Sequence, residues 1–98
     1  MPKRVYLATT DLLFRSKLDA VVHAGGAEVT RDEAACDLAV VELDLPGAQD
    51  RIRKAVARGV AVLAFGSHVH ADVLRAAREA GAVAVPNSGI EDRLRGML

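Results

Sequence analysis

A regular alternation of short apolar runs with amphipathic segments constrains this chain more than any other feature of its 98 residues. The apolar runs are at most six residues long, and most contain no polar residue, which is the pattern of strands buried on both faces. Such strands belong to parallel sheets covered by helices on both sides. Strands are expected at Val5–Ala8, Ala27–Thr30, Leu38–Leu43, Val60–Phe65 and Val83–Val85.

The segments between these runs have helical spacing. In the first of them Phe14, Leu18 and Val22 share one face, and Gly25-Gly26 then stops the helix because glycine tolerates positive φ. The connection between Thr30 and Cys36 is too short for more than one turn. Helices are expected over Asp11–His23, Pro46–Gly59, Ala71–Ala80 and Gly89 to the C-terminal residue, the last from the capping-box spacing of Ser88 and Glu91.

This repeated strand–helix–strand order predicts an α/β fold with right-handed crossovers. We expect one domain over residues 1–98, built on a doubly wound, five-stranded parallel sheet. The expected strand order is 2-1-3-4-5, one of the two common orders of this architecture.

Composition excludes several classes of function. Thirteen basic residues balance thirteen acidic ones and only three residues are aromatic, so we expect no nucleic-acid and no membrane partner. Cys36 is the single cysteine, which rules out an intramolecular disulfide and fits a reducing cytoplasm. Glycine-rich phosphate loops and the Gly-x-Ser-x-Gly motif are missing from the sequence, so neither enzymatic activity nor a cofactor is expected.

Polar residues concentrate where the strands are expected to end, which is the edge at which doubly wound folds bind ligands. The first strand is followed by Thr9, Thr10 and Asp11. Glu42 and Asp44 end the third strand, Gly66 and Ser67 follow the fourth, and Ser88 follows the fifth.

Four segments resemble the receiver domains of bacterial two-component response regulators. They are VYLATTDLLFR around the first strand, LAVVELDLPG at the third, AVLAFGS at the fourth and Glu79-Ala-Gly-Ala82 before the fifth. The resemblance covers nearly the whole chain and implies a flavodoxin-like fold, a role in regulation and a protein partner.

The same alignment shows where the chain departs from that family. Thr9 and Thr10 stand where receivers carry the acidic pair that holds Mg²⁺, and Glu42 replaces the phospho-accepting aspartate. Gly66 takes the place of the phosphate-sensing Thr or Ser, with Ser67 one residue later. Pro86-Asn-Ser-Gly89 stands where Lys-Pro is usual, and the second helix is nearly missing.

These departures predict a receiver-like domain that has lost phosphorylation, because transfer to a carboxylate needs a divalent cation with oxygen ligands. Glu42 would then supply a permanent negative charge near the phosphoryl position. Two alternatives stay open. One is a small-ligand or anion-binding module using Thr9, Thr10, Ser67 and Ser88; the other is an atypical receiver that is still phosphorylated, with Asp11 and Asp44 as metal ligands.

Several of these residues also have simple structural interpretations. Asp44 is expected to cap the helix that starts near Pro46, and Thr9 and Thr10 to cap the first helix. Glu42 would be a solvated charge at a strand end. Cys36 is expected in the core, His23 paired with Asp19, and His68-Val-His70 too small a set for a metal site.

The last helix suggests self-association. Leu94, Met97 and Leu98 cannot all find cover in a small monomer, and an exposed apolar patch favours contact with another chain. The resemblance implies the same surface, formed by the fourth helix, fifth strand and fifth helix of receivers. A homodimer is expected through residues 72–80, 83–85 and 91–98.

Overall fold

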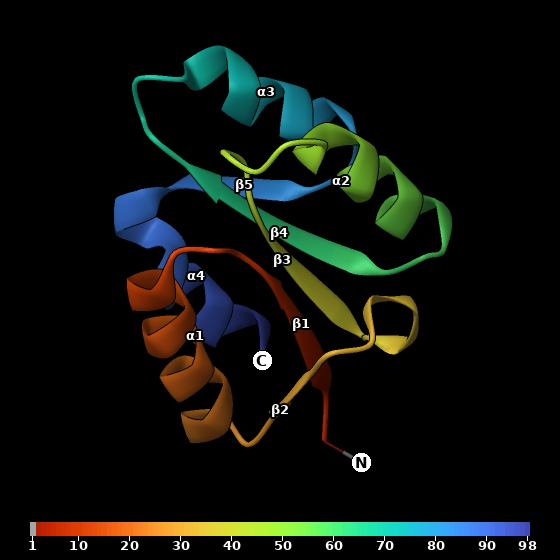
Figure 1. Cartoon of the computed structure of the whole chain (residues 1–98), viewed down its shortest axis with the longest axis vertical. Coiled ribbons are helices and arrows are strands. Elements are labelled where there is room, and N and C mark those ends of the chain that lie inside the picture. Colours follow the sequence, from red (N-terminus) through yellow and green to blue (C-terminus); the bar gives the residue numbers. More distant parts are fainter. Residues whose placement is uncertain (1) are drawn as a thin grey trace.

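The computed structural model describes residues 2–98 and contains a five-stranded, all-parallel sheet in the order β2-β1-β3-β4-β5 (Figure 1). The predicted fold class and strand order are therefore confirmed. The strands are β1 (Arg4–Ala8), β2 (Glu28–Thr30), β3 (Leu38–Glu42), β4 (Ala61–Gly66) and β5 (Val83–Pro86).

Helices cover both faces of the sheet. Figure 1 shows α1 (Leu12–Ala24) and α4 (Ile90–Met97) together on one side, and α2 (Ala48–Ala57) and α3 (Ala71–Glu79) on the other. Two short 3₁₀ turns, η1 (Glu33–Ala35) and η2 (Asn87–Gly89), complete the order of elements. The expected single turn between Thr30 and Cys36 is thus confirmed as η1.

Glycine sets two of the helix boundaries. Gly26, with φ +77°, ends α1 as predicted, and the amides of Gly25 and Gly26 bond to carbonyls of the last turn. Gly47, with φ +74°, precedes α2 directly, so that helix begins two residues later than the expected Pro46. A residue with a Cβ would be strained at either position.

Alternation along the strands divides the core into two layers. On the α1/α4 face the sheet presents large side chains, among them Leu38, Leu63 and Phe65. On the α2/α3 face it presents mostly alanine and valine, including Ala39, Ala64 and Ala84. Both faces of β3 and β4 are buried, as their continuous apolar sequence predicts.

Candidate functional site

A threonine and a glutamate form a polar pair at the carboxyl ends of β1 and β3. Thr9 is 5% exposed, the single buried polar residue within residues 2–98, and its hydroxyl donates a hydrogen bond to Oε1 of the half-buried Glu42. The same hydroxyl accepts the N–H of Asp11 at 3.2 Å. Thr9 therefore fixes the direction of the Glu42 carboxylate, which is not simply solvated.

Asp11, and neither threonine, caps α1. Its Oδ1 accepts the backbone N–H groups of Leu13 at 2.9 Å and Phe14 at 3.1 Å. The prediction that Thr9 and Thr10 perform this function is wrong, because Thr9 is engaged with Glu42 and the helix begins after Asp11. Thr10 is exposed at the rim of the site.

Asp44 does not cap α2. The N-cap of that helix is Gly47, which has no side chain to offer, and Asp44 lies exposed in the preceding turn. That prediction is wrong because the turn through Pro46 and Gly47 adds residues between the carboxylate and the helix. Asp44 instead lines a small hollow of about 40 Å³ together with Gly66 and Ser67.

Leu43 fills the space beside Gly66. A Cβ built on Gly66 would lie 3.3 Å from Leu43 Cβ, tighter than ordinary van der Waals contact. The hydroxyl of Ser67 accepts the N–H of Val69 at 3.4 Å within its own loop. Packing against Leu43 therefore leaves little room for a side chain at position 66, and the Ser67 hydroxyl bonds within its own loop.

The polar residues expected at this edge fall into separate groups. Thr9 and Thr10 line one hollow, and Ser67 lines another with Asp44. Ser88 is exposed in η2, and α4 has no side-chain cap, so the predicted capping box is wrong. Across residues 2–98, no three His, Cys, Asp or Glu side chains are grouped so that they could hold a metal ion.

Two minor predictions are confirmed. Cys36 is buried at the start of β3, and burial is the main cause that raises the pKa of its thiol. The ring Nδ1 of His23 lies 2.6 Å from Oδ1 of Asp19 on the surface of α1. Neither residue lies near the Thr9–Glu42 pair in the sheet, so neither belongs to the candidate site.

The expected apolar patch on the last helix is not formed. Leu94 is 0% exposed between α4 and the sheet, and Met97 and Leu98 pack partly buried against the same core layer. The prediction was wrong because α4 lies against α1, whose C-terminal glycine Gly25 leaves room for Leu98.

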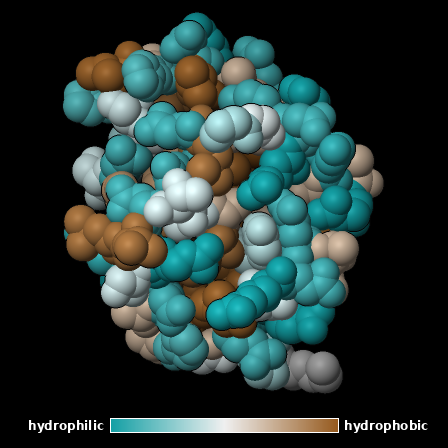
Figure 2. All heavy atoms as spheres, viewed as in Figure 1, coloured by the Kyte–Doolittle hydropathy of each residue, from teal (hydrophilic) through white to brown (hydrophobic). Residues whose placement is uncertain are grey.

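The large exposed apolar side chains are Leu12, Leu13 and Val69. In the view of Figure 2, apolar surface forms separate spots among polar side chains. The sequence held a signal for the first two, since the inward face of α1 runs through Phe14 and Leu18 and leaves no place for Leu12 or Leu13.

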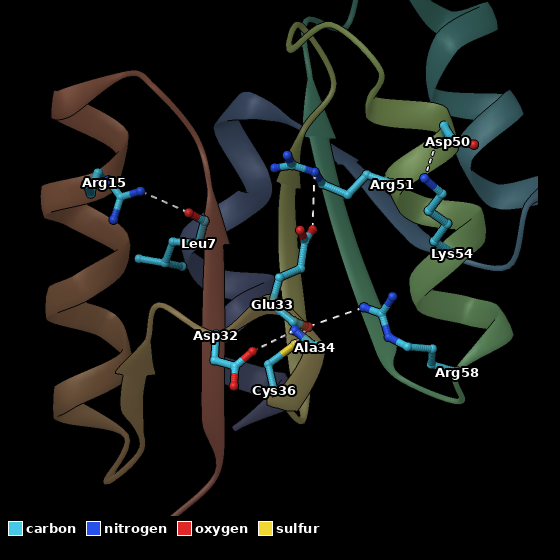
Figure 3. A network of polar contacts seen from close by, with 10 residues as sticks. All are labelled: Leu7, Arg15, Asp32, Glu33, Ala34, Cys36, Asp50, Arg51, Lys54 and Arg58. Carbon is cyan, nitrogen blue, oxygen red and sulfur yellow. Dashed lines mark hydrogen bonds and ion pairs between the residues drawn. The ribbon is translucent and has the colours of Figure 1, made fainter.

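Basic side chains from two helices also gather beside β1. Arg15 and Arg51 line one hollow over this strand, and Figure 3 shows them on either side of it. The Nε of Arg51 lies 3.2 Å from a carboxylate oxygen of Glu33 in η1, so this side chain is not simply solvated. Tyr6, half-buried on β1, contributes to the same hollow.

Solved structures of receiver domains match this chain over nearly its whole length. A response regulator from Thermotoga maritima superposes with a TM-score of 0.79 at 16% identity, covering 99% of this chain and 94% of its own. A CheY-like receiver domain from Methanospirillum hungatei JF-1 gives 0.75 at 15%, with coverages of 98% and 96%. The BeF3-activated DrrB receiver domain gives 0.83 at 17%, with coverages of 99% and 94%.

These likenesses establish the receiver-like, flavodoxin-type fold. No family model matches the sequence, and no curated protein matches it either. Within residues 2–98, no helix is long and apolar enough to cross a membrane.

Proposed function

We propose that this chain is a receiver-like regulatory domain over residues 1–98 that acts by binding another protein and is not phosphorylated at its strand edge. One observation carries the proposal: the Glu42 carboxylate stands at the end of β3 and accepts a hydrogen bond from Thr9. The chemistry of the neighbouring groups supports the same conclusion.

Phosphoryl transfer to a carboxylate requires a divalent cation to neutralise charge between the oxygens, and hard cations take carboxylate ligands. Here the side chains of Thr9 and Thr10 carry no charge. Asp11 turns one carboxylate oxygen toward the amides of α1, and Asp44 lies in a different hollow from Thr9. Among residues 2–98, Glu42 is therefore the one residue whose carboxylate forms a hydrogen bond with the Thr9 side chain.

The proposed role of Glu42 is to hold a constant negative charge at this edge. Its hydrogen bond to Thr9 orients the charge without any phosphorylation step. Glu42→Gln keeps an acceptor oxygen for Thr9 but removes the charge. We expect the variant to fold and to bind the partner protein more weakly. Unchanged binding would show that the Glu42 charge takes no part in the interaction.

An amide-resolved NMR titration with Mg²⁺ and beryllofluoride, a phosphoryl mimic, tests the loss of phosphorylation. The matched DrrB domain was solved in the BeF3-activated form, so the reagent suits this fold. We expect the amides of Thr9, Glu42, Gly66 and Ser67 to stay unmoved at millimolar Mg²⁺. Saturable shifts at these amides that spread into α3 would show a live receiver and overturn the proposal.

A rebuilt variant provides the positive control. The triple substitution Thr9→Asp, Thr10→Asp and Glu42→Asp restores the aspartates of receivers at three of the positions where this chain departs from that family. Gain of a Mg²⁺-dependent beryllofluoride response in this variant, with none in the natural chain, would trace the loss to these residues. Thermal denaturation with added phosphate or nucleotide tests the alternative of a small-ligand module. If the chain is such a module, the added ligand should raise the thermal midpoint.

The homodimer expected through residues 72–80, 83–85 and 91–98 stays a prediction. Its apolar basis is smaller than the sequence indicated, since Leu94 is buried within the chain. Sedimentation velocity over a range of protein concentrations measures it directly.

A further inference from the structure

The connection between β2 and β3 leaves part of the sheet without a helix. A crossover between parallel strands needs about 10–12 residues or more including its helix, but this one spans residues 31–37 and forms only η1. On that side, α2 packs on β3 and β4, and α3 packs on β4 and β5. Tyr6 of β1 and Thr30 of β2 consequently remain half-exposed on this face.

The uncovered area is a groove in which Tyr6, Leu45 and Pro46 lie among polar and charged side chains. Two adjoining hollows, of about 280 Å³ and 390 Å³, share Tyr6 and Arg15. One extends to Leu45, Pro46 and Arg51, and the other to Thr30 and Arg31. A third hollow shares Pro46 and Arg51 and continues along α2 past Lys54 to Arg58.

This groove concentrates positive charge on a chain whose net charge is zero. Five cationic side chains line it against two carboxylates, those of Glu33 and Asp50. The two carboxylates pair with Arg51 at 3.2 Å and Lys54 at 3.0 Å. For Arg15, Arg31 and Arg58, the described residues offer no carboxylate within ion-pair distance.

Two of these three arginines bond to neutral carbonyl groups. Arg15 donates to the carbonyl oxygens of Leu7 at 3.0 Å and Thr9 at 3.3 Å, which fixes its charge at the groove wall (Figure 3). Arg58 donates to the Glu33 carbonyl at 3.2 Å and secures η1 at the end of the groove. The walls are thus held in place and still carry uncompensated charge.

We propose that this groove binds an acidic amphipathic helix of a partner protein, in the place where the fold would otherwise put its own second helix. The apolar face of that helix would cover Tyr6, Leu45 and Pro46, and its carboxylates would face Arg15, Arg31 and Arg51. The inference rests on the part of the proposed function that concerns protein binding, and it assigns the surface and the chemistry of the partner. Nucleic acid fits less well because Tyr6 is the one aromatic residue among those that line the groove.

The probe is a synthetic helical peptide of about 14 residues, roughly 20 Å long, with leucine and alanine on one face and glutamate on the other. It is titrated into the full ¹⁵N-labelled chain. We expect saturable shifts at the amides of Tyr6, Arg31, Leu45 and Arg51, and loss of binding at about 1 M salt, where the Debye length is near 3 Å. The same peptide with glutamine in place of glutamate should bind more weakly.

Two variants with the same change of charge test the location. Arg31→Glu reverses an exposed charge in the groove, and Arg75→Glu reverses an exposed charge on α3 outside it. We expect the first to weaken peptide binding about fivefold and the second to leave it nearly unchanged. Equal effects of the two variants, or equal binding of the glutamine peptide, would overturn the proposal.

Other occupants give distinct results. Stronger shifts of the same amides by a single-stranded DNA oligonucleotide would assign the groove to nucleic acid. Shifts that depend on protein concentration without peptide would assign it to a second copy of this chain. Peptide shifts confined to residues 72–98, or no shifts at millimolar peptide, would overturn the proposal that the groove binds the helix. The proposed loss of phosphorylation is tested separately, by the beryllofluoride titration.

Discussion

The two faces of the sheet differ in the side chains that they present and in how completely helices cover them. On the α1/α4 face, Leu18, Phe65 and Leu94 are fully buried, and both helices lie against each other over the strands. On the α2/α3 face, alanines such as Ala39, Ala64 and Ala77 dominate, and the part over β1 and β2 has no helix among the described elements. Stability is therefore expected to reside mainly on the first face, which leaves the second face free for binding.

The largest expected effect comes from a matched pair of leucines on the two faces. Leu94→Ala on α4 should lower the free energy of unfolding by about 3–4 kcal/mol, because its large neighbours cannot collapse into the space. Leu74→Ala on α3, 5% exposed beside smaller residues, should cost about 2 kcal/mol. Urea denaturation of both variants measures the difference, and equal losses would contradict the division of stability between the faces.

The second prediction concerns the edge of the α2/α3 face. Gly66→Thr adds a side chain where the Cβ meets Leu43 at 3.3 Å, so we expect a loss of about 1–3 kcal/mol from overpacking. Trimming the neighbour in the double variant Gly66→Thr, Leu43→Ala should couple the two sites and recover part of the loss. Strict additivity in the double-mutant cycle would show that Leu43 does not restrict this position.

The third prediction compares two acidic residues at the strand ends. Asp11→Ala removes the acceptor for two amides of α1 and should cost about 1 kcal/mol. Asp44→Ala, at an exposed carboxylate that caps no helix, should change stability by less than about 0.5 kcal/mol. Thermal denaturation of the two variants distinguishes them, and a larger cost for Asp44→Ala would reverse the assignment of the cap.

The smallest expected effect is a pH dependence from Cys36, which lies on the α2/α3 face. Burial raises the pKa of its thiol, so the folded chain keeps this proton to higher pH than the unfolded chain does. The stabilisation is fully present below the unfolded pKa of about 8.5 and is lost as pH rises through the folded value, by at most about 1.4 kcal/mol per pH unit.

Urea denaturation of the natural chain and of Cys36→Ala across this range isolates the contribution of the thiol. The difference in unfolding free energy between the two should shrink as pH rises. A difference that stays constant with pH would mean that the thiol titrates alike in the folded and unfolded chains.

The sequence predicted the sheet, its strand order and the short turn before β3, because these depend on apolar periodicity and on the length of connections. It did not predict which side chains cap the N-termini of the helices. Spacing alone made Thr9, Thr10, Asp44 and Ser88 equally good caps, but one hydrogen bond to Glu42 commits Thr9 elsewhere, and Gly47 moves the start of α2 beyond Asp44.

The burial of Leu94 and the basic groove escaped prediction for a related reason. Both depend on elements distant in sequence: α4 packs against α1 around Leu94, and Arg15 of α1 and Arg51 of α2 line the same hollow. A helical pattern shows which side chains share a face of one helix. It does not show which second helix covers that face or which wall is left open.

The hydrogen bonds of Arg15 have a consequence for the chain in solution at high concentration. β2 pairs with β1 no further than Tyr6, so the last part of β1 is an edge strand, a kind of edge at which a foreign strand can pair. The guanidinium of Arg15 occupies the carbonyls of Leu7 and Thr9, and its charge repels a second copy of the same edge. The second strand of this sheet is only three residues long and leaves part of β1 uncovered. A single arginine therefore protects that edge from pairing with another chain.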